Sequence, residues 1–261
     1  MSKFPPYGGF ITFESYSIFR EMNLVIDSGN SAAKVGIFNH EKLIEKFTFP
    51  ALEGLEQFIF DTKFENLIIS SVKADAELIA SWGNKANKHF ILRKGLPLPV
   101  NNLYSTPDTL GMDRLAAVCG AHQLFPTHNC LVIDAGTCIT YEFKDQTGNY
   151  HGGSISPGLN MRFKAVNTFT AKLPLVSPKA GAKLIGQSTE ASIQSGVVNG
   201  LLAEIEGIIR LYKEKFPELQ VILCGGDAGF FENQLKASIF ASPELVLIGL
   251  NSILIYNVNH S

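Results

Sequence analysis

The feature of this sequence that most constrains its fold is a repeated segment. Residues 24–31 (LVIDSGNS) return as residues 131–138 (LVIDAGTC), 107 positions later by the difference between 24 and 131. Each copy is an apolar run that enters an Asp-x-Gly turn, and a second strand-like run follows at 33–38 or at 139–143. A strand, a tight glycine turn and a second strand are the pattern of a β-hairpin. The chain is therefore predicted to contain two copies of one fold.

The elements that follow each hairpin support this duplication. Strand-like runs alternate with helical stretches in both halves, which indicates mixed sheets flanked by helices. We expect strands at 42–50, 66–72 and 89–92 and helices at 52–60, 74–86 and 112–125 in the first half, and a run at 151–155, helices at 159–169, 190–216 and 243–257 and a strand at 219–224 in the second. The predicted fold class is α/β, with two duplicated RNase H-like lobes, 22–125 and 126–261, and a cleft between them.

The first 21 residues are expected to lie outside this fold. They contain Pro-Pro and Gly-Gly pairs but no long apolar run of the kind that a signal peptide requires. Met22 stands directly before the strong strand pattern of 24–26, so we interpret it as the functional start of the fold. The segment 1–21 is then an N-terminal extension or the product of a misjudged start site, and an ordered extra strand at 10–13 is the alternative.

Charge and composition indicate what kind of partner the protein binds. The formal net charge is −2 and the basic residues are scattered, so the sequence lacks the basic patches typical of proteins that bind nucleic acid or membrane surfaces. No apolar run reaches the ~18 residues needed to span a bilayer. The four cysteines have no metal-ligand spacing, and each lies in or beside an apolar stretch, as reduced thiols do. We predict a cytoplasmic protein with a small-molecule ligand and neither a nucleic-acid nor a membrane partner.

The two Asp-x-Gly turns have the chemistry of a nucleotide-phosphate site. Glycine lets the backbone approach a phosphate closely, and the N–H groups of the turn act as donors. Asp27 can hold a hydrated Mg²⁺, and Lys34 can offer a positive charge to a phosphate. Either turn alone would be interpreted as an ordinary turn, but two in equivalent positions predict opposed phosphate loops across a nucleotide cleft. This arrangement resembles the actin, sugar-kinase and heat-shock ATPase superfamily, in which segment 221–227 would accommodate adenine.

Segment 104–114 is the most informative part of the chain for the phosphoryl acceptor. Loop residues give way to a helical pattern from Met112 onward, which places Asp113 and Arg114 in the first helical turn. The helix N-terminus stabilises a carboxylate there, and kinases use such an Asp to orient the acceptor hydroxyl and take its proton. The planar fork of Arg114 suits a carboxylate on the substrate. On these residues alone, an Asp at a helix N-terminus with a surface Arg partner is the alternative.

These segments together resemble one family, the type III pantothenate kinases, from Met22 nearly to the C-terminus. The family's motifs follow in order as 27–34 (DSGNSAAK), Tyr104 with 111–114 (GMDR), 134–140 (DAGTCIT), 152–158 (GGSISPG), 170–174 (TAKLP) and 186–189 (GQST). Six motifs in the family's order make the resemblance specific. Two local departures are Ser31, where Thr is more usual, and Thr106, where Asn is more usual.

The resemblance implies an enzyme that phosphorylates the primary hydroxyl of pantothenate with ATP, giving 4'-phosphopantothenate in the first step of coenzyme A biosynthesis. It also implies roles for particular residues. Asp113 is the catalytic proton acceptor, ATP binds Asp27, Ser28, Gly29, Asn30, Ser31, Ala32, Ala33, Lys34 and Thr137, and pantothenate binds Tyr104, Gly111, Met112, Asp113, Arg114 and Thr189. Asp27 would hold Mg²⁺ through water, and Asp134 would hold a potassium or ammonium ion.

The family further implies a homodimer with substrate sites near the subunit interface. Ser192, Gly196 and Gly200, each four positions apart, would permit close approach of two helices, and packing within one chain is an equal alternative. Two other functions stay open. The same fold could serve another acceptor, in a sugar kinase, a kinase for another small hydroxylated metabolite or a polyphosphate-type phosphatase. It could also serve a non-catalytic relative that binds a ligand as an accessory factor in gene regulation. The three intact aspartates of the motifs favour catalysis.

Overall fold

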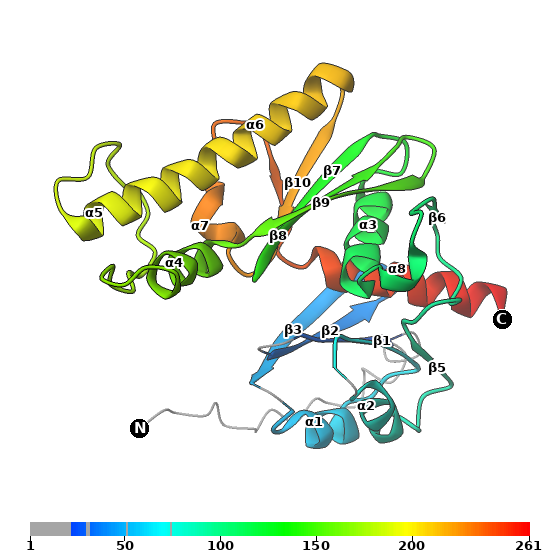
Figure 1. Cartoon of the computed structure of the whole chain (residues 1–261). Coiled ribbons are helices and arrows are strands. Elements are labelled where there is room, and N and C mark those ends of the chain that lie inside the picture. Colours follow the sequence, from blue (N-terminus) through cyan, green and yellow to red (C-terminus); the bar gives the residue numbers. More distant parts are fainter. Residues whose placement is uncertain (1–21, 30–31, 51, 74) are drawn as a thin grey trace.

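The computed structural model describes residues 22–29, 32–50, 52–73 and 75–261. Within them two β-sheets lie on either side of a pair of helices, and further helices cover the outer face of each sheet (Figure 1). The α/β class and the two lobes with mixed sheets are confirmed. The predictions for 1–21, including the extra strand at 10–13, and those for Asn30 and Ser31 fall outside the described residues. Of the helices in the described part of the chain, none combines the length and the apolar character of a transmembrane span.

The first sheet has the strand order β3-β2-β1-β4-β5. Its strands are β1 Met22–Ser28, β2 Ala32–Asn39, β3 Lys42–Pro50, β4 Asn66–Ser71 and β5 Lys88–Ile91. The first three are antiparallel neighbours, β4 runs parallel to β1, and β5 runs parallel to β4. Helices α1 (Leu55–Asp61) and α2 (Ala76–Trp82) cover the outer face, where they share one apolar core with Leu24 and Ile26 of β1.

The second sheet repeats this order as β9-β8-β7-β10-β11, with β6 added beside β9. Its strands are β6 Asn101–Asn102, β7 Cys130–Ala135, β8 Cys138–Lys144, β9 Asn149–Pro157, β10 Gln220–Cys224 and β11 Phe240–Ala241. Again the first three strands of the unit are antiparallel, and β10 runs parallel to the first of them. The two sheets therefore share one topology, as the repeated hairpin predicts. Strands β6 and β11 were not predicted, because two residues are too few to show a periodic pattern.

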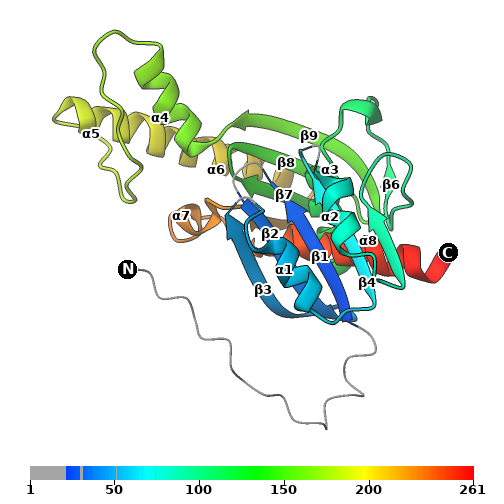
Figure 2. The ribbon, with the colours of Figure 1, turned by 90° about the horizontal axis from the view of Figure 1, so that it is seen from below.

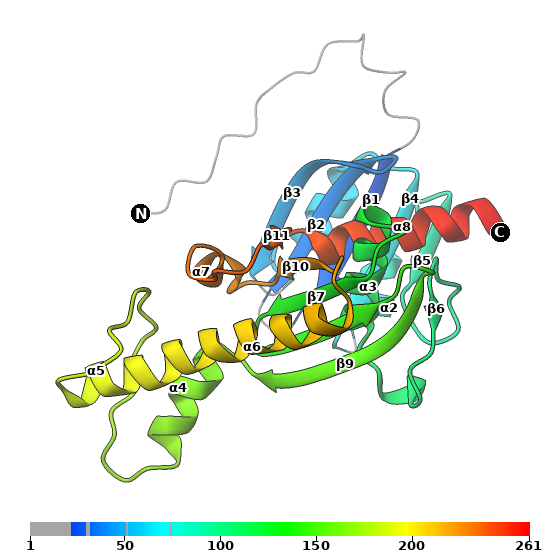
Figure 3. The ribbon, with the colours of Figure 1, turned by 90° about the horizontal axis from the view of Figure 1, so that it is seen from above.

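Helices α3 (Met112–Leu124) and α8 (Leu245–His260) form the layer between the two sheets (Figures 1 and 3). Helix α8 packs along α3 and contacts β1 and β4, while α3 contacts β7 and β8. The two helices approach closely because Gly249 has no side chain: a Cβ atom there would lie 1.7 Å from the carbonyl oxygen of Ala116. The sequence prediction assigns the last helix to the second lobe, and the structure shows that it also packs on the first sheet. The two lobes therefore share one helical layer.

An arm extends past the end of the second sheet at which β9 leads into α4 (Figures 2 and 3). Its elements are α4 Leu159–Thr168, α5 Thr189–Gln194, a π-helical segment Ser195–Asn199 and α6 Gly200–Lys215. The single helix predicted at 190–216 is thus a continuous helical run with a π-helical segment inside it. The apolar face of α6 and the short helix α7 (Ala228–Glu232) pack on the sheet. The loop between α4 and α5 instead exposes apolar side chains, with Phe169 86%, Leu184 82% and Ile185 76% exposed.

Candidate active site

Two aspartates face the space between the sheets, because side chains alternate along a strand. In β1, Val25 belongs to the core around α3 and α8, and Asp27, two residues further on, lies on the same face. In β7, Val132 packs with residues of α3 and α8, and Asp134 follows it on the same face. Each strand ends at its Asp-x-Gly turn, so the repeat directs both turns toward the shared helical layer.

A cavity of about 690 Å³ lies between these turns. It is bounded by both turns, the first turn of α3, the start of α4, the loop after β10 and the start of α8. The predicted site residues that line it are Asp27, Gly29, Ala32, Lys34, Asp113, Arg114, Asp134 and Thr137, and the other lining residues are Val72, Gly136, Cys138, Thr140, Asn160, Met161, Lys164, Gly225, Gly226, Asp227, Pro243 and Val246. The fold therefore brings residues from both halves of the chain to one site.

Strand register gives the two turns different chemistry. Asp27 is the register partner of Lys34 across the first hairpin, and Asp134 is the register partner of Thr140 across the second. Register partners on antiparallel strands lie side by side on one face of a sheet. The first turn therefore carries an ammonium group beside its carboxylate, and the second turn carries a hydroxyl group at the same place.

Of the predicted ATP-binding residues that the structure describes, Ser28 and Ala33 do not line the cavity. Ser28 is buried, and its Oγ donates to Asp75 Oδ2 at 3.2 Å, away from the turn. Ala33 is buried in the core under β2. Asn30 and Ser31 lie outside the described residues. Among the side chains of this motif that the structure places, Asp27 and Lys34 therefore supply the polar groups of the first turn.

The loop after β10 closes on the second turn. Gly225 has a φ of 95°, in the left-handed region that favours glycine. A Cβ atom at Gly225 would lie 2.4 Å from Asp134 Oδ1 and 2.3 Å from the carbonyl oxygen of Ala135. A side chain at this position would therefore collide with the turn. Segment 221–227, predicted to accommodate adenine, reaches the cavity at its glycine pair.

Four carboxylates, those of Asp27, Asp113, Asp134 and Asp227, line the cavity together with the cationic groups of Lys34, Arg114 and Lys164. Burial raises the pKa of the Asp27 carboxyl to about 6, Lys34 opposes this shift, and the charges of Asp113 and Asp134 add to it. Burial, followed by the charge of Asp113, raises the pKa of Asp134 to about 6 as well, again against Lys34. A cation bound in the cavity would relieve the mutual repulsion of these groups.

The residues present fit a hydrated cation better than a metal enclosed by protein ligands. Within the described ranges, no three His, Cys, Asp or Glu side chains are arranged to hold a metal ion by themselves. Mg²⁺ usually keeps several waters and uses one or two carboxylates together with substrate phosphates. Ser70, the register partner of Asp27 on β4, is fully buried, and its hydroxyl makes no hydrogen bond of good geometry with a described residue. The Ser70 hydroxyl nevertheless opposes part of the rise in the pKa of Asp27. A second polar group therefore stands beside this carboxylate.

The first turn of α3 carries Asp113 and Arg114 but directs their side chains apart. Asp113 Oδ1 accepts a hydrogen bond from the Arg114 N–H at 2.9 Å, as carboxylates at helix N-termini do. Arg114 is 8% exposed, and its Nε and Nη2 donate to the two oxygens of Glu142 at 2.5 and 2.8 Å. The guanidinium fork that we expected to meet a substrate carboxylate is thus paired with Glu142 of β8. Sequence reasoning missed Glu142, because an acidic residue inside a strand does not indicate its partner.

Four of the predicted pantothenate-binding residues lie outside the lining of the cavity. Tyr104 stacks on Tyr150, with ring centroids 6.1 Å apart and planes 9° apart. Gly111 and Met112 begin α3. Thr189 is the first residue of α5, and α5 lies toward the free end of the arm, away from α3 (Figure 1). A single chain therefore brings Asp113 to the two turns but leaves Thr189 at a distance.

Two polar residues of α4 belong to the site although they were not predicted. Asn160 and Lys164 lie in the first two turns of this helix and line the cavity. The preceding Gly158 N–H donates to the carbonyl oxygen of Thr137 at 3.1 Å, so the helix starts beside the second turn. Helix N-termini favour anions. The GGSISPG segment directly before a helical pattern was the available signal for these residues.

The raised pKa values of Asp27 and Asp134 predict how the stability of the nucleotide-free protein depends on pH. Both folded-state values, about 6, lie above the ordinary value of 3.8, so the folded state binds these protons more tightly than the unfolded state does. The free energy of unfolding that they contribute is therefore present below about pH 4 and is lost as the pH rises through about 6. Chemical denaturation at several pH values between about 4 and 8 measures this change.

The control for this prediction is Asp134→Asn, which cannot ionise at that position. The variant is expected to show a smaller loss of stability between about pH 4 and 6 than the natural protein, measured without divalent cation. Equal pH dependence in the two proteins would show that burial and the neighbouring charge of Asp113 do not raise the pKa of Asp134.

Comparison with solved structures shows which known folds the chain resembles. The chain is similar to a Baf family transcriptional activator from Campylobacter jejuni, with a TM-score of 0.59 and 22% identity over 90% of this chain and 99% of that chain. It is also similar to a glucokinase from an Antarctic psychrotroph, with a TM-score of 0.52 and 12% identity over 90% and 99% of the two chains. At these identities the likeness shows the fold alone. The chain therefore shares the two-lobed fold of these two structures.

Comparison of sequences then identifies the family. The model of the family described as Type III pantothenate kinase matches residues 23–211. The chain is 49% identical over 239 residues to a type III pantothenate kinase of Phocaeicola vulgatus, covering 90% of this chain and 99% of that protein. It is 45% identical over 240 residues to that of Christiangramia forsetii, with the same coverage. The chain belongs to the type III pantothenate kinase family. Kinases of this kind act on ATP together with a divalent metal ion.

Proposed function

We propose that this chain transfers the γ-phosphoryl group of ATP to the primary hydroxyl of pantothenate, giving 4'-phosphopantothenate in the first step of coenzyme A biosynthesis. The observation that carries the proposal is that both Asp-x-Gly turns and Asp113 open on one cavity in a member of this kinase family. Phosphoryl transfer needs positioning and charge neutralisation more than covalent chemistry. A cavity that joins two phosphate turns to a carboxylate meets both needs.

The nucleotide site of this proposal uses the two turns. Gly29 and Thr137 offer turn donors to the phosphates, and Lys34 offers a positive charge. Asp27 would hold a hydrated Mg²⁺ beside the Ser70 hydroxyl, and Asp134 would hold a potassium or ammonium ion. The cations supply neutralisation of the phosphate charge. The raised pKa values of both carboxyls support this assignment, because a bound cation would stabilise their ionised form against burial and mutual repulsion.

Asp113 is the proton acceptor in this proposal. Its Oδ1 already accepts the Arg114 N–H, which fixes the carboxylate at the helix N-terminus and leaves Oδ2 for the substrate. The carboxylate would orient the primary hydroxyl toward the γ-phosphorus and take the hydroxyl proton late in a loose transition state. Residues Tyr104, Gly111, Met112, Arg114 and Thr189 would bind the remainder of pantothenate.

A homodimer would bring Thr189 to that site. Thr189 lies toward the end of the arm, whose loop exposes Phe169, Leu184 and Ile185, and exposed apolar surface of this kind is typical of an interface. A Cβ atom at Gly196 or Gly200 would meet no described residue within 4 Å, which favours helix packing between chains. We place the partner subunit's Thr189 beside the acceptor end of the cavity.

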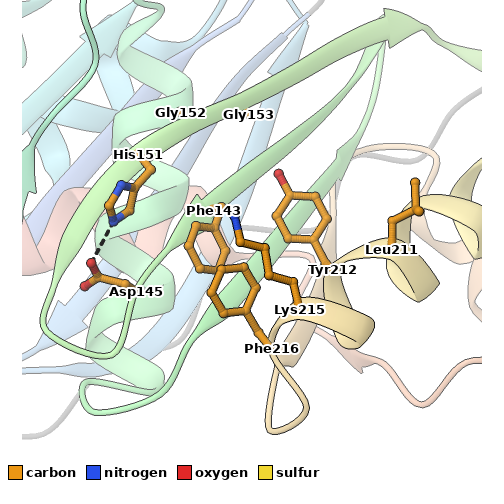
Figure 4. Close-up of a pocket in the computed structure, with 9 residues that line it drawn as sticks. All are labelled: Phe143, Asp145, His151, Gly152, Gly153, Leu211, Tyr212, Lys215 and Phe216. Carbon is orange, nitrogen blue, oxygen red and sulfur yellow. Dashed lines mark hydrogen bonds and ion pairs between the residues drawn. The ribbon is translucent and has the colours of Figure 1, made fainter.

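A second cavity also supports a dimer. It measures about 730 Å³ and lies between β8, β9 and α6, where Phe143, Leu211, Tyr212 and Phe216 line it with Lys215, Asp145, His151, Gly152 and Gly153 (Figure 4). Leu211 is 57% exposed. This apolar surface of the second sheet could receive the apolar loop of a partner's arm, and burial of both would stabilise the pair.

Complementation between two defective variants tests this arrangement. Asp113→Asn and Thr189→Ala are each expected to lose activity when alone. After mixing and subunit exchange, random pairing gives mixed dimers that contain one intact site, so roughly a quarter of all sites should be active. Pantothenate phosphorylation is measured before and after exchange, with exchange verified by native mass spectrometry. A mixture that exchanges but recovers no activity would show that Thr189 does not act across an interface.

A panel of acceptors tests the function itself. ADP release is measured with ATP, Mg²⁺ and potassium in the presence of pantothenate, glucose, N-acetylglucosamine or glycerol. We expect release with pantothenate above all others. Faster ADP release with a sugar would show that the chain is a sugar kinase. ATP binding without ADP release for any acceptor would favour a regulatory protein without turnover.

The cellular setting follows from the same chemistry. The four cysteines, Cys119, Cys130, Cys138 and Cys224, are free thiols, and three of them are buried. Free thiols and a requirement for ATP are typical of the cytoplasm. We therefore place the enzyme there, with ATP and pantothenate as its ligands and without a nucleic-acid or membrane partner.

A further inference from the structure

The carboxylate of Glu142 is fully buried between the second sheet and α3. It lies on β8 opposite Val132 of β7, on the face of the sheet that carries Asp134. Burial of a carboxylate is strongly unfavourable unless the group is paired and hydrogen-bonded. The stability of the buried Glu142 carboxylate therefore depends on its hydrogen-bond partners. One of these partners, Arg114, adjoins Asp113 at the proposed acceptor site.

Both oxygens of Glu142 are engaged. Oε1 accepts from Arg114 Nε at 2.5 Å, and Oε2 accepts from Arg114 Nη2 at 2.8 Å and from the Tyr150 hydroxyl at 2.6 Å. Tyr150 is itself fully buried and stacks on Tyr104. The guanidinium carbon of Arg114 lies 5.3 Å from the ring centroid of Tyr104. Arg114 is thus held at its edge by Glu142 and over its face by Tyr104.

This network joins the acceptor helix to the second phosphate turn. Arg114 follows Asp113 directly, and its N–H donates to the Asp113 carboxylate. Glu142 is two residues from Thr140 on the same strand, and Thr140 is the register partner of Asp134. Strand β8 therefore contacts the acceptor helix through the pair of Glu142 and Arg114. The same strand lies beside Asp134 because Thr140 is its register partner. A shift of Arg114 would move the first turn of α3 relative to the second turn.

We infer that Glu142 and Tyr150 are positioning residues that set the place of Asp113 and Arg114 relative to the second phosphate turn. The inference rests on the proposed function and adds to it. It also changes the role of Arg114: the Nε–Nη2 edge is occupied by Glu142, so this edge does not grip the substrate carboxylate. Arg114 acts first as the link between β8 and the acceptor helix.

The test compares two tyrosines of the second sheet. Tyr150→Phe removes the hydroxyl that donates to Glu142, and Tyr141→Phe is the matched control, because Tyr141 is equally buried and its hydroxyl donates to Glu204 on the opposite face at 2.9 Å. Loss of a hydrogen bond to a charged group should lower kcat/KM for pantothenate about 10-fold or more in Tyr150→Phe. The KM for ATP should change less than about twofold, and Tyr141→Phe should keep natural kinetics.

A double-mutant cycle supplies the second measurement. Glu142→Gln keeps the shape of the side chain but removes its charge, and Arg114→Lys cannot form the two-pronged pair. If the two residues act as one unit, each change should lower kcat/KM for pantothenate strongly and the double variant should lose little more. Pantothenamides, which lack the substrate carboxylate, should show the same losses, because the defect lies in positioning and not in carboxylate binding.

Several outcomes would overturn the inference. Equal kinetics of Tyr150→Phe and Tyr141→Phe would do so, as would additive effects of Glu142→Gln and Arg114→Lys, or losses that vanish with pantothenamides. If Glu142→Gln does not fold, the pair of tyrosine variants decides alone. Failure of the proposed function is recognised separately, because the natural protein itself would then fail to phosphorylate pantothenate.

Discussion

Replacement of Asp113 by asparagine is expected to lower kcat for pantothenate phosphorylation by about 10²–10⁴-fold, the usual contribution of a general base. The amide oxygen can still accept the Arg114 N–H that Oδ1 accepts in the natural protein, so α3 should stay in place. ATP binding should be nearly normal, because its phosphates are assigned to the two turns. Steady-state kinetics and calorimetric titration of ATP measure the two effects.

Asp108→Asn is the matched control for this change. Asp108 lies just before α3, is largely exposed and pairs with Lys94 at the surface, so its substitution should leave kcat unaltered. An Asp113→Asn variant that keeps most of the natural kcat would remove Asp113 from the chemical step. Loss of ATP affinity in parallel with kcat would place Asp113 in the nucleotide site instead.

Replacement of potassium by lithium is expected to abolish most of the activity. In our proposal Asp134 holds a potassium or ammonium ion beside the phosphates, and lithium is too small for a site shaped to a larger ion. Loss of one electrostatic stabiliser of a transition state lowers kcat by on the order of 10²-fold. Rates are measured at constant ionic strength in potassium, ammonium, sodium and lithium chloride, with Mg²⁺ and ATP fixed.

The variant Asp134→Asn is the internal control for this cation effect. It should be slow in every salt, so that the rates in potassium and in lithium become alike. Natural protein that is equally active after full replacement of potassium by lithium would contradict a monovalent-cation role for Asp134. A variant that keeps the preference for potassium would place the ion elsewhere in the cavity.

The parts of the fold that were predictable are those that local sequence determines. The repeated LVID runs have the apolar character of buried strands, and the Asp-x-Gly turns that follow them define hairpins. Alternation along each strand then places Asp27 and Asp134 on the inner faces of the two sheets. The meeting of the two turns at one cavity therefore follows from duplication, since equivalent strands of two similar lobes present equivalent ends.

The parts that were not predictable depend on contacts between distant residues. Arg114 pairs with Glu142, and the Ser28 hydroxyl donates to Asp75. These tertiary contacts cannot be predicted from the residue types alone. Helix α8 is mostly apolar but also buries Asn251, Ser252 and Asn257. Its composition indicates a buried helix, but it does not indicate which sheets cover the helix. The position of Thr189 on a projecting arm is likewise fixed by packing of α6 and not by its motif.

Transfer of label from ATP tests the central claim most directly. Natural protein is incubated with γ-labelled ATP, pantothenate, Mg²⁺ and potassium, and the labelled product is identified by mass spectrometry, with Asp113→Asn in parallel. We expect the label on the 4'-hydroxyl of pantothenate with the natural protein and almost none there with the variant. Label that appears as inorganic phosphate, or that stays on bound ATP while pantothenate is unchanged, would contradict a pantothenate kinase.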